Sequence, residues 1–299
     1  MFSYKRLLIV IFVISFFAFV PKKPIPLKSY PVPVGTLKIS DNFYVDETEV
    51  TNFSYLEYIY WLKRVYGSDS KEYLNALPDT LVWQNKNTFN TPYVKYYLTH
   101  PAYKDFPVVG VSYKQAKDFC KWRSDRVFEK FLIKKKIIKF LEKPTPDEVF
   151  TIEKYFSGKY LNIQPDPNIQ YYPEYSLPDS IQVLQIKNYV DSLIKTNMHK
   201  LSKYKQFALY NFKDTNNKQL NSDVINAVYS GYASKHLPIS YLYGNLREWT
   251  DKEGLTFGGS WIDNYETIQS NPFIYQQEKT SAFTGFRCVC QYKKWGSDN

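Results

Sequence analysis

The sequence predicts one mixed α+β domain with short twisted strands, two main helices and much irregular loop. Hydrophobic residues make up 44% and charged residues 23% of the 299 positions, which is typical of a globular chain with a sizeable core. Short apolar alternations predict strands near both ends of the chain, and two stretches between them have sustained helical periodicity. Aromatic residues reach 18%. They suit loop-rich folds, because a large ring buries area while a tyrosine hydroxyl reaches stray backbone groups.

The first twenty residues have the pattern of an export signal. Lys5 and Arg6 form a basic start, and an apolar run from Leu7 to Val20 follows. The run is short for a membrane span, which takes about 20 residues, and it fits the apolar part of a secretory signal. Since no A-x-A-type cleavage site follows, residues 1–20 are either a signal peptide or an uncleaved N-terminal anchor. We expect export to the periplasm or cell envelope in both cases.

A proline- and lysine-rich linker covers residues 21–36. The alternations Leu37–Ile39 and Phe43–Val45 then predict two short strands. Asn52 is expected to cap a first helix, and Gly67 is expected to end it because glycine accepts a left-handed helix C-terminus.

The stretch Ala76–Pro107 lacks lasting periodicity and is expected to be a long ordered loop. Ser112 and Gln115 then form a capping box at the start of a second helix. Apolar residues at helical spacing follow and place Cys120 on the buried face of that helix.

The pattern weakens over about residues 128–230, which we interpret as a divergent insertion within a single domain covering residues 37–292. Short strand-like pieces return from Tyr241 to Tyr292. Residues 293–299 form a tail.

The chain carries a net charge of +10 and a pI near 9.1. Part of the charge gathers in Lys130–Lys143, for which we expect a solvated helical face first and an anionic surface or acidic partner second. No nucleic acid is expected as a partner, because no binding motif accompanies the lysines and the chain begins with an export signal.

Five pieces occur in a characteristic order: Phe43–Asn52, Pro107–Trp122, Gly244–Trp249, Gly258–Trp261 and Gly285–Cys288. Together they resemble the formylglycine-generating enzyme (sulfatase-modifying factor) family. The resemblance implies a C-type-lectin-like fold. The residues that it marks as motif or structural positions are Gly244, Trp249, Gly258, Gly259, Ser260, Trp261, Gly285, Phe286 and Arg287.

Three further pieces are similar to gliding-motility and type IX secretion lipoproteins that carry this domain: Leu77–Trp83, His100–Tyr103 and Trp122–Val127. Those proteins carry a lipidated cysteine after their leader, and this chain has no cysteine at that place. The resemblance therefore concerns their domain and not their lipid anchor. The family's Arg-Leu-Pro-Thr-Glu-Ala-Glu-Trp-Glu segment has only a weak counterpart, Tyr175–Ser180.

The family's enzymes oxidise a substrate cysteine with a copper-bound cysteine pair shortly before the Gly-Phe-Arg motif. Here the matching stretch, Asp263–Thr284, contains no cysteine. Soft thiolates are what Cu(I) prefers, so no copper is expected. The three histidines, His100, His199 and His236, lack a ligand spacing, so no iron is expected either. The alternative remains an active formylglycine-generating enzyme or a diverged metal-dependent oxidase.

The resemblance implies a disulfide between Cys120 and Cys288. It would close a loop of about 170 residues and stabilise the fold by roughly 5 kcal/mol. Cys290 is then the odd thiol, expected to be a small buried hydrophobe.

The resemblance also implies a calcium site at Asn245 and Glu248, since amide and carboxylate oxygens suit Ca²⁺. A purely hydrogen-bonded turn is the alternative, with Arg247 neutralising Glu248. The sequence thus favours a non-catalytic envelope protein that binds a protein or glycan, plausible settings being gliding or type IX secretion. A structural subunit packed against a ring or membrane is the other interpretation.

Overall fold

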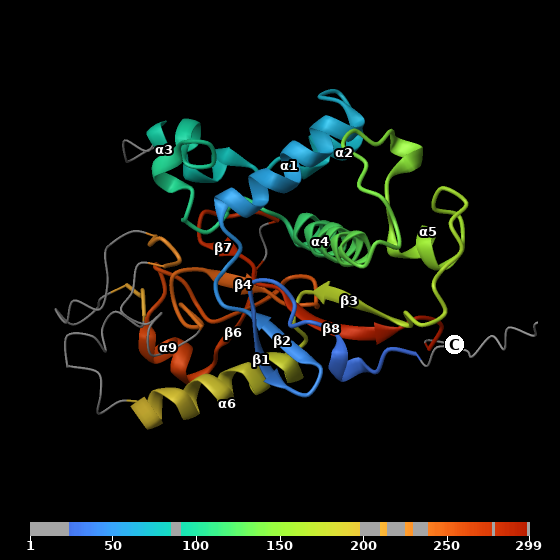
Figure 1. Ribbon diagram of the computed structural model, residues 1–299. Helices are drawn as coiled ribbons and strands as arrows, with labels where there is room; N and C mark the ends of the chain where they lie inside the picture. Colours follow the sequence, from blue (N-terminus) through green and yellow to red (C-terminus); the bar gives the residue numbers. More distant parts are fainter. Residues whose placement is uncertain are drawn as a thin grey trace, which may run out of the picture.

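The structure is a computed structural model that describes residues 24–84, 91–197, 210–213, 225–229, 239–276 and 279–297. Within these ranges the strands form two four-stranded sheets, in the orders β1-β2-β8-β3 and β6-β5-β4-β7 (Figure 1). The strands are β1 (Thr36–Ser40), β2 (Phe43–Asp46), β3 (Tyr171–Ser176), β4 (Arg247–Trp249), β5 (Leu255–Phe257), β6 (Phe273–Tyr275), β7 (Thr284–Gly285) and β8 (Val289–Lys294).

Helices of very different lengths surround the sheets. The α-helices are α1 (Asn52–Tyr66), α2 (Lys71–Ala76), α3 (Thr91–Tyr96), α4 (Tyr113–Lys134), α5 (Ile152–Phe156), α6 (Ser180–Asn197) and α9 (Tyr265–Ser270). The 3-10 turns are η1 (Leu27–Ser29), η2 (Thr80–Trp83), η3 (Pro101–Tyr103) and η4 (Pro146–Glu148).

The first sheet joins the two ends of the domain. Strand β8 lies between β2 and β3 and pairs antiparallel with both. Successive side chains of a strand point to opposite faces. Tyr44 and Cys290 therefore pack in the cluster that includes α1 and α4, whereas Val45 and Val289 pack against α6. Figure 1 shows α1 and α4 on one side of this sheet and α6 on the other.

Both predicted helices form where the sequence places them. Helix α4 begins with the capping box of Ser112 and Gln115, and Cys120 lies on its buried face. Helix α1 ends at Gly67 as predicted. Its cap, however, is Thr51, whose side chain accepts a hydrogen bond from the backbone of Ser54.

Two parts of the chain contain more structure than the sequence predicted. The expected loop Ala76–Pro107 holds η2, α3 and η3 in its described residues. The segment interpreted as an insertion supplies the sheet strand β3 and a third long helix, α6, which packs through Val183, Ile186 and Val190. Tertiary packing stabilises such pieces, and their own periodicity is too weak or too short to reveal them.

The mixed α+β class is confirmed, with short strands and much irregular chain between them. In the part of the chain that the structure describes, every helix is too short or too polar to cross a membrane. The predicted leader, residues 1–20, lies outside the described residues.

Gly244 tests how tightly these loops pack. Its φ is +77°, and a Cβ there would lie 2.5 Å from the backbone oxygen of Asn211. Gly254 has the same φ, but its nearest neighbour would be 3.6 Å away, in ordinary contact. We expect Gly244→Ala to lower the free energy of unfolding by at least about 2 kcal/mol more than Gly254→Ala. Urea unfolding of both variants measures this, and equal losses would contradict it.

Candidate functional site

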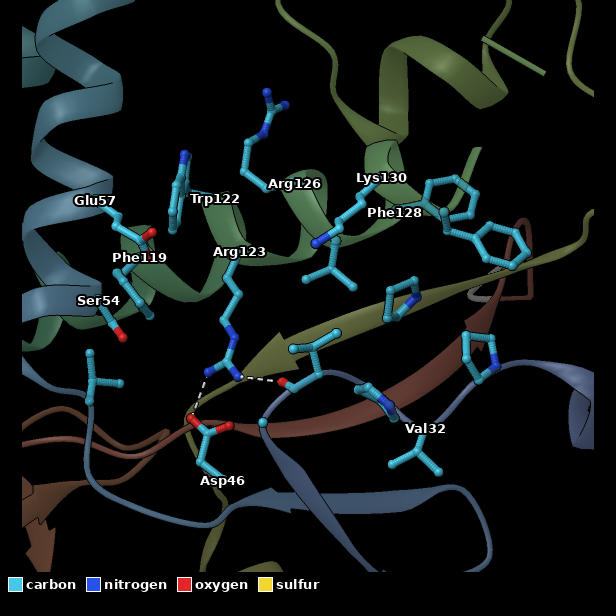
Figure 2. Close-up of a pocket in the computed structure, with 18 of the residues that line it drawn as sticks. Val32, Asp46, Ser54, Glu57, Phe119, Trp122, Arg123, Arg126, Phe128 and Lys130 are labelled. Carbon is cyan, nitrogen blue, oxygen red and sulfur yellow. Dashed lines mark hydrogen bonds and ion pairs between the residues drawn. The ribbon is translucent and has the colours of Figure 1, made fainter. Parts of the chain in front are cut away.

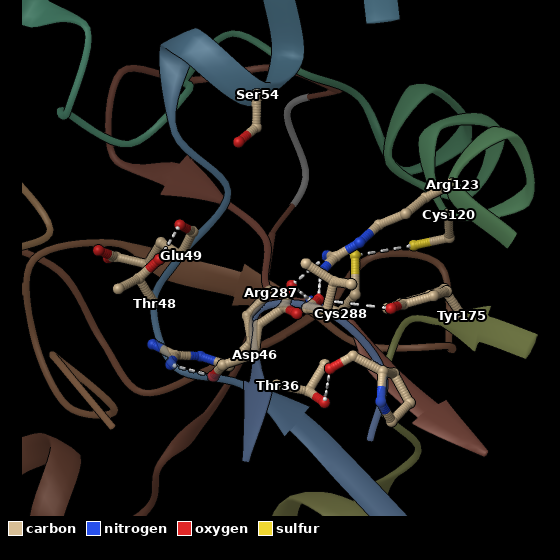
Figure 3. Close-up of polar contacts among 12 residues, drawn as sticks. Thr36, Asp46, Thr48, Glu49, Ser54, Cys120, Arg123, Tyr175, Arg287 and Cys288 are labelled. Atoms are coloured by element: carbon tan, nitrogen blue, oxygen red, sulfur yellow. Dashed lines mark hydrogen bonds and ion pairs between the residues drawn. The ribbon is translucent and has the colours of Figure 1, made fainter. Parts of the chain in front are cut away.

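A cluster of buried charged side chains lies where β2, β4 and β8 approach α4 (Figure 3). Asp46 and Glu49 come from the end of β2 and the loop after it, Glu248 from β4, and Arg287 from the loop before β8. Arg123 comes from the middle of α4. All except Arg123 are less than 5% exposed, so their charges must be compensated within the protein.

Arg287 and Glu248 form the innermost ion pair. Nη2 of Arg287 lies 2.7 Å from Oε1 of Glu248, and Nε lies 3.0 Å from both carboxylate oxygens. The remaining guanidinium nitrogen, Nη1, donates to the Asp46 carbonyl at 3.0 Å. Nη2 also donates to the Ser240 carbonyl at 2.8 Å. Burial lowers the pKa of Arg287, but the charge and hydrogen bond of Glu248, together with the charges of Glu49 and Asp46, raise it overall.

Arg123 and Asp46 form a second ion pair, nearer the surface. Nη1 of Arg123 donates to Oδ2 of Asp46 at 2.6 Å, and Nη2 donates to the Val34 carbonyl at 3.0 Å. The guanidinium also lies 4.2 Å from the ring centroid of Tyr175. The same Asp46 oxygen accepts the backbone N–H of Cys288 at 3.1 Å. This pair therefore fastens the chain before β1 to α4 and the first sheet.

Among the described acids of the cluster, Glu49 is the one without an ion pair of its own. Nδ2 of Asn245 donates to its two oxygens at 2.9 and 3.2 Å. Burial raises the pKa of Glu49 well above 4.5, and the nearby charge of Glu248 raises it further. Arg287 lowers it, but by less. The protonated form of Glu49 is therefore favoured more than in a free glutamate, and Arg287 is the cation that acts on both Glu49 and Glu248.

The residues expected to bind calcium have other partners. Oδ1 of Asn245 accepts hydrogen bonds from Nδ2 of Asn211 at 2.9 Å and the backbone N–H of Asn226 at 2.8 Å. Glu248 faces the Arg287 guanidinium. Among the described residues, no three His, Cys, Asp or Glu side chains are placed to hold a metal ion. As arranged, Asn245 and Glu248 do not fit a calcium site, and their contacts are those of a hydrogen-bonded turn.

The prediction that Arg247 neutralises Glu248 was wrong. Arg247 instead pairs with Asp263. Its Nε lies 2.8 Å from Oδ2 of Asp263, and its Nη2 lies 2.5 Å from Oδ1. The reason is the strand geometry, because Arg247 and Glu248 are neighbours on β4 and point to opposite faces. Glu248 therefore meets Arg287, which the sequence singled out only as a motif residue.

Cys120 and Cys288 lie side by side as buried thiols, with their sulfur atoms 3.4 Å apart. Burial first, and the Cys120 thiol second, raise the pKa of Cys288. A disulfide bond is about 2.05 Å long, so a small approach of the two side chains would form it. The disulfide stays a prediction. Cys290 is buried on the same face of the sheet, as expected of a small apolar residue.

A groove with a volume of about 520 Å³ borders the cluster (Figure 2). The extended chain Tyr30–Gly35 forms one wall, and Phe119, Trp122 and Phe131 of α4 line the other. The Asp46–Arg123 pair lies at its base. Lys130 and Lys134, both exposed, give one end a positive charge, whereas most of the lining is apolar.

The comparisons with known proteins bear on this arrangement. The family described as "Sulfatase-modifying factor enzyme 1-like domain" matches residues 22–292. The chain belongs to this family. Its fold, expected from the resemblance, is thereby confirmed. The crystal structure of CarF is similar over 83% of this chain and 86% of CarF, with 16% sequence identity and a TM-score of 0.46. No curated protein matches the sequence.

The family's motif glycines and aromatic residues lie around the cluster. Gly258 has a φ of +90°, and a Cβ there would lie 2.6 Å from the Leu242 carbonyl oxygen. A Cβ on Gly285 would lie 2.7 Å from the carbonyl oxygen of Val108. Trp249 and Phe286 are buried in the main core, Ser260 donates to Asp263, and Trp261 is half-buried. At these positions the chain packs closely or hydrogen-bonds within the protein.

Of the three histidines, the structure describes His100 alone. Nδ1 of His100 accepts the backbone N–H of Ala102 and caps a 3-10 turn. His199 and His236 lie outside the described residues.

Sequence reasoning missed three members of the cluster: Asp46, Glu49 and Arg123. Each stands within a piece that carried a resemblance, and the acidic run Asp46–Glu49 directly after a strand was the available signal. The pattern of this run did not reveal that Asp46 and Glu49 are buried, since acidic residues are usually exposed.

We predict that the protein, produced in an oxidising compartment and purified without reductant, contains the Cys120–Cys288 disulfide, because the two sulfur atoms lie only 3.4 Å apart and such compartments favour disulfides. Alkylation under denaturing conditions should then modify Cys290 alone. In the control variant Cys288→Ala, Cys120 and Cys290 should both react. Three reactive thiols in the parent protein would contradict the prediction.

Glu49 should make stability depend on pH. An acid whose pKa is raised in the folded state contributes stability that is present below the unfolded-state value, near 4.5, and is lost as pH rises through the folded pKa. We expect Glu49→Gln, which cannot ionise, to flatten this decline and to exceed the parent in stability at alkaline pH. Urea unfolding over a pH series tests this, with the exposed Glu57→Gln as control. Parallel curves for the parent and Glu49→Gln would count against it.

Proposed function

We propose that this chain is a non-catalytic member of its family that binds an extended segment of a partner protein in the groove between Tyr30–Gly35 and α4. The observation that carries the proposal is the groove itself. It has apolar walls, a buried ion pair at its base and two exposed lysines at one end. An apolar segment with an acidic group that meets Lys130 or Lys134 is complementary to it.

The chemistry of the cluster supports binding over catalysis. The family's cysteine pair has no counterpart in Asp263–Thr284. The buried acids beside the groove are committed within the protein, Asp46 to Arg123 and Glu248 to Arg287, and Glu49 accepts from Asn245. Each of these acids thus has at least one carboxylate oxygen engaged in a contact within the protein.

The setting that we propose is the cell envelope, reached through the export signal in residues 1–20. The pieces similar to gliding-motility and type IX secretion lipoproteins make that machinery the first place to search for the partner. A glycan is the other envelope ligand that the sequence suggested.

The test is site-specific photocrosslinking in intact cells. A crosslinking residue at Val34, which is 68% exposed on the groove wall, should form one dominant adduct. The matched control is Tyr275, which is 67% exposed on β6 and not part of the groove lining. Reversing the charges with Lys130→Glu and Lys134→Glu should remove the Val34 adduct. An adduct that survives the reversal, or equal adducts at Tyr275, would sink the groove assignment.

Catalysis is tested separately. The purified domain is incubated with a sulfatase-type cysteine peptide, Cu(I), oxygen and reductant, beside an active formylglycine-generating enzyme. We expect the mass of the peptide to stay unchanged. The mass loss of cysteine-to-formylglycine conversion would overturn the non-catalytic assignment.

A further inference from the structure

A second cavity, away from the groove, has aromatic rings along much of its wall. Tyr210, Phe212, Tyr243 and Tyr265 line a space of about 290 Å³ between α6 and α9, together with Lys187, Asp191, Ile268 and Gln269. The ring centroids of Tyr210 and Tyr265 are 5.3 Å apart, those of Phe212 and Tyr265 5.5 Å, and those of Tyr210 and Tyr243 6.3 Å. The planes of these three ring pairs are inclined at 45° to 56°, and those of Tyr210 and Phe212 at 32°.

The backbone holds the segment 210–213 in place. The N–H of Asn245 donates to the Asn211 carbonyl at 2.7 Å, and the N–H of Lys213 donates to the Asp263 carbonyl at 3.0 Å. Tyr210 and Phe212 alternate with these bonded residues. The segment is thus hydrogen-bonded to two other parts of the chain. These bonds fix the backbone positions from which its aromatic side chains extend.

Two of the family's motif glycines leave room for the segment 210–213 to pack in this position. The backbone of Gly244 lies against that of Asn211. Gly259 has a φ of +70°, and a Cβ there would lie 2.6 Å from Cγ1 of Ile268 and 3.0 Å from Cε1 of Phe212, two residues of the cavity wall. Larger residues at either position would push the cage out of shape.

The cage carries a carboxylate at its edge. Asp191 of α6 lies near the Tyr243 hydroxyl, and the hydroxyls of Tyr210 and Tyr265 lie near each other. Burial raises the pKa of all three tyrosines, with the Asp191 charge contributing to each, so the hydroxyls are neutral. Lys187 pairs with Asp191 at 2.6 Å, but both side chains are about a third or more exposed, and such a pair is weak and exchangeable.

We propose that this cage binds a trimethylammonium group, carried either by a small soluble molecule or by a lipid headgroup. The faces of aromatic rings attract cations, and a quaternary ammonium has no N–H to donate, so rings suit it better than hydrogen-bond acceptors do. Asp191 supplies the opposite charge. The site is separate from the groove, and it stands or falls independently of the proposed partner binding.

Calorimetry of the exported domain with choline tests the proposal, and 3,3-dimethylbutan-1-ol, the neutral isostere, is the matched ligand control. We expect saturable choline binding and at least about tenfold weaker binding of the isostere, because only the cation gains the ring and carboxylate attraction. Equal affinities, or no saturable choline binding, would overturn the proposal.

Variants distinguish the cage from unspecific aromatic binding. Tyr265→Leu should abolish choline binding, and Asp191→Asn should weaken it severalfold. The control Tyr275→Leu, an exposed tyrosine on β6, should bind like the parent. Thermal unfolding checks that each variant is folded. If a folded Tyr265→Leu variant binds choline as well as Tyr275→Leu does, the cage is not the site.

The two sources of the ligand are separated with vesicles. Binding to phosphatidylcholine vesicles but not to phosphatidylglycerol vesicles, lost in Tyr265→Leu, identifies a lipid headgroup. Choline binding without vesicle binding identifies a soluble ligand. Preference for a methyl glucoside over choline would instead show that the cage binds sugar and would refute the ammonium assignment.

Discussion

The ion pair between Arg287 and Glu248 is the contact around which the domain is arranged. Removing a charge from water costs several kcal/mol, and good geometry with further hydrogen bonds is needed to offset it. Arg287 obtains them from Glu248 on β4, from the end of β2 and from Ser240. Because these partners come from distant parts of the chain, the pair can form only when both sheets are in place.

The first sheet then determines what lies on either side. Its central strands have both faces covered, by α1 and α4 on one side and by α6 on the other. The groove lies on the α4 side, and the aromatic cage lies beside α6. The two sites are therefore chemically separate. One has apolar walls with a cationic end, and the other has aromatic walls with a carboxylate.

The same motifs that define the family serve these sites indirectly. Gly244 and Gly259 let other chain segments approach closely, and Asn245 hydrogen-bonds to Glu49 and to Asn211. In this chain the motifs are used for packing and hydrogen bonding. Function is expected in the surfaces that they support, where the groove and the cage differ from neighbouring regions in charge and in aromatic content.

The sequence by itself determined the mixed class, the two helices with their ends at Gly67 and Ser112, the strands around Phe43–Val45 and the family. Each depends on local patterns or on motifs in a fixed order. Only the tertiary structure decided that Arg287, and not Arg247, neutralises Glu248. It alone showed that Asp46 pairs with Arg123 and that β3 and α6 belong to the main body. These contacts join residues far apart in the chain, and no local pattern records which distant partner a buried charge or an apolar face will meet.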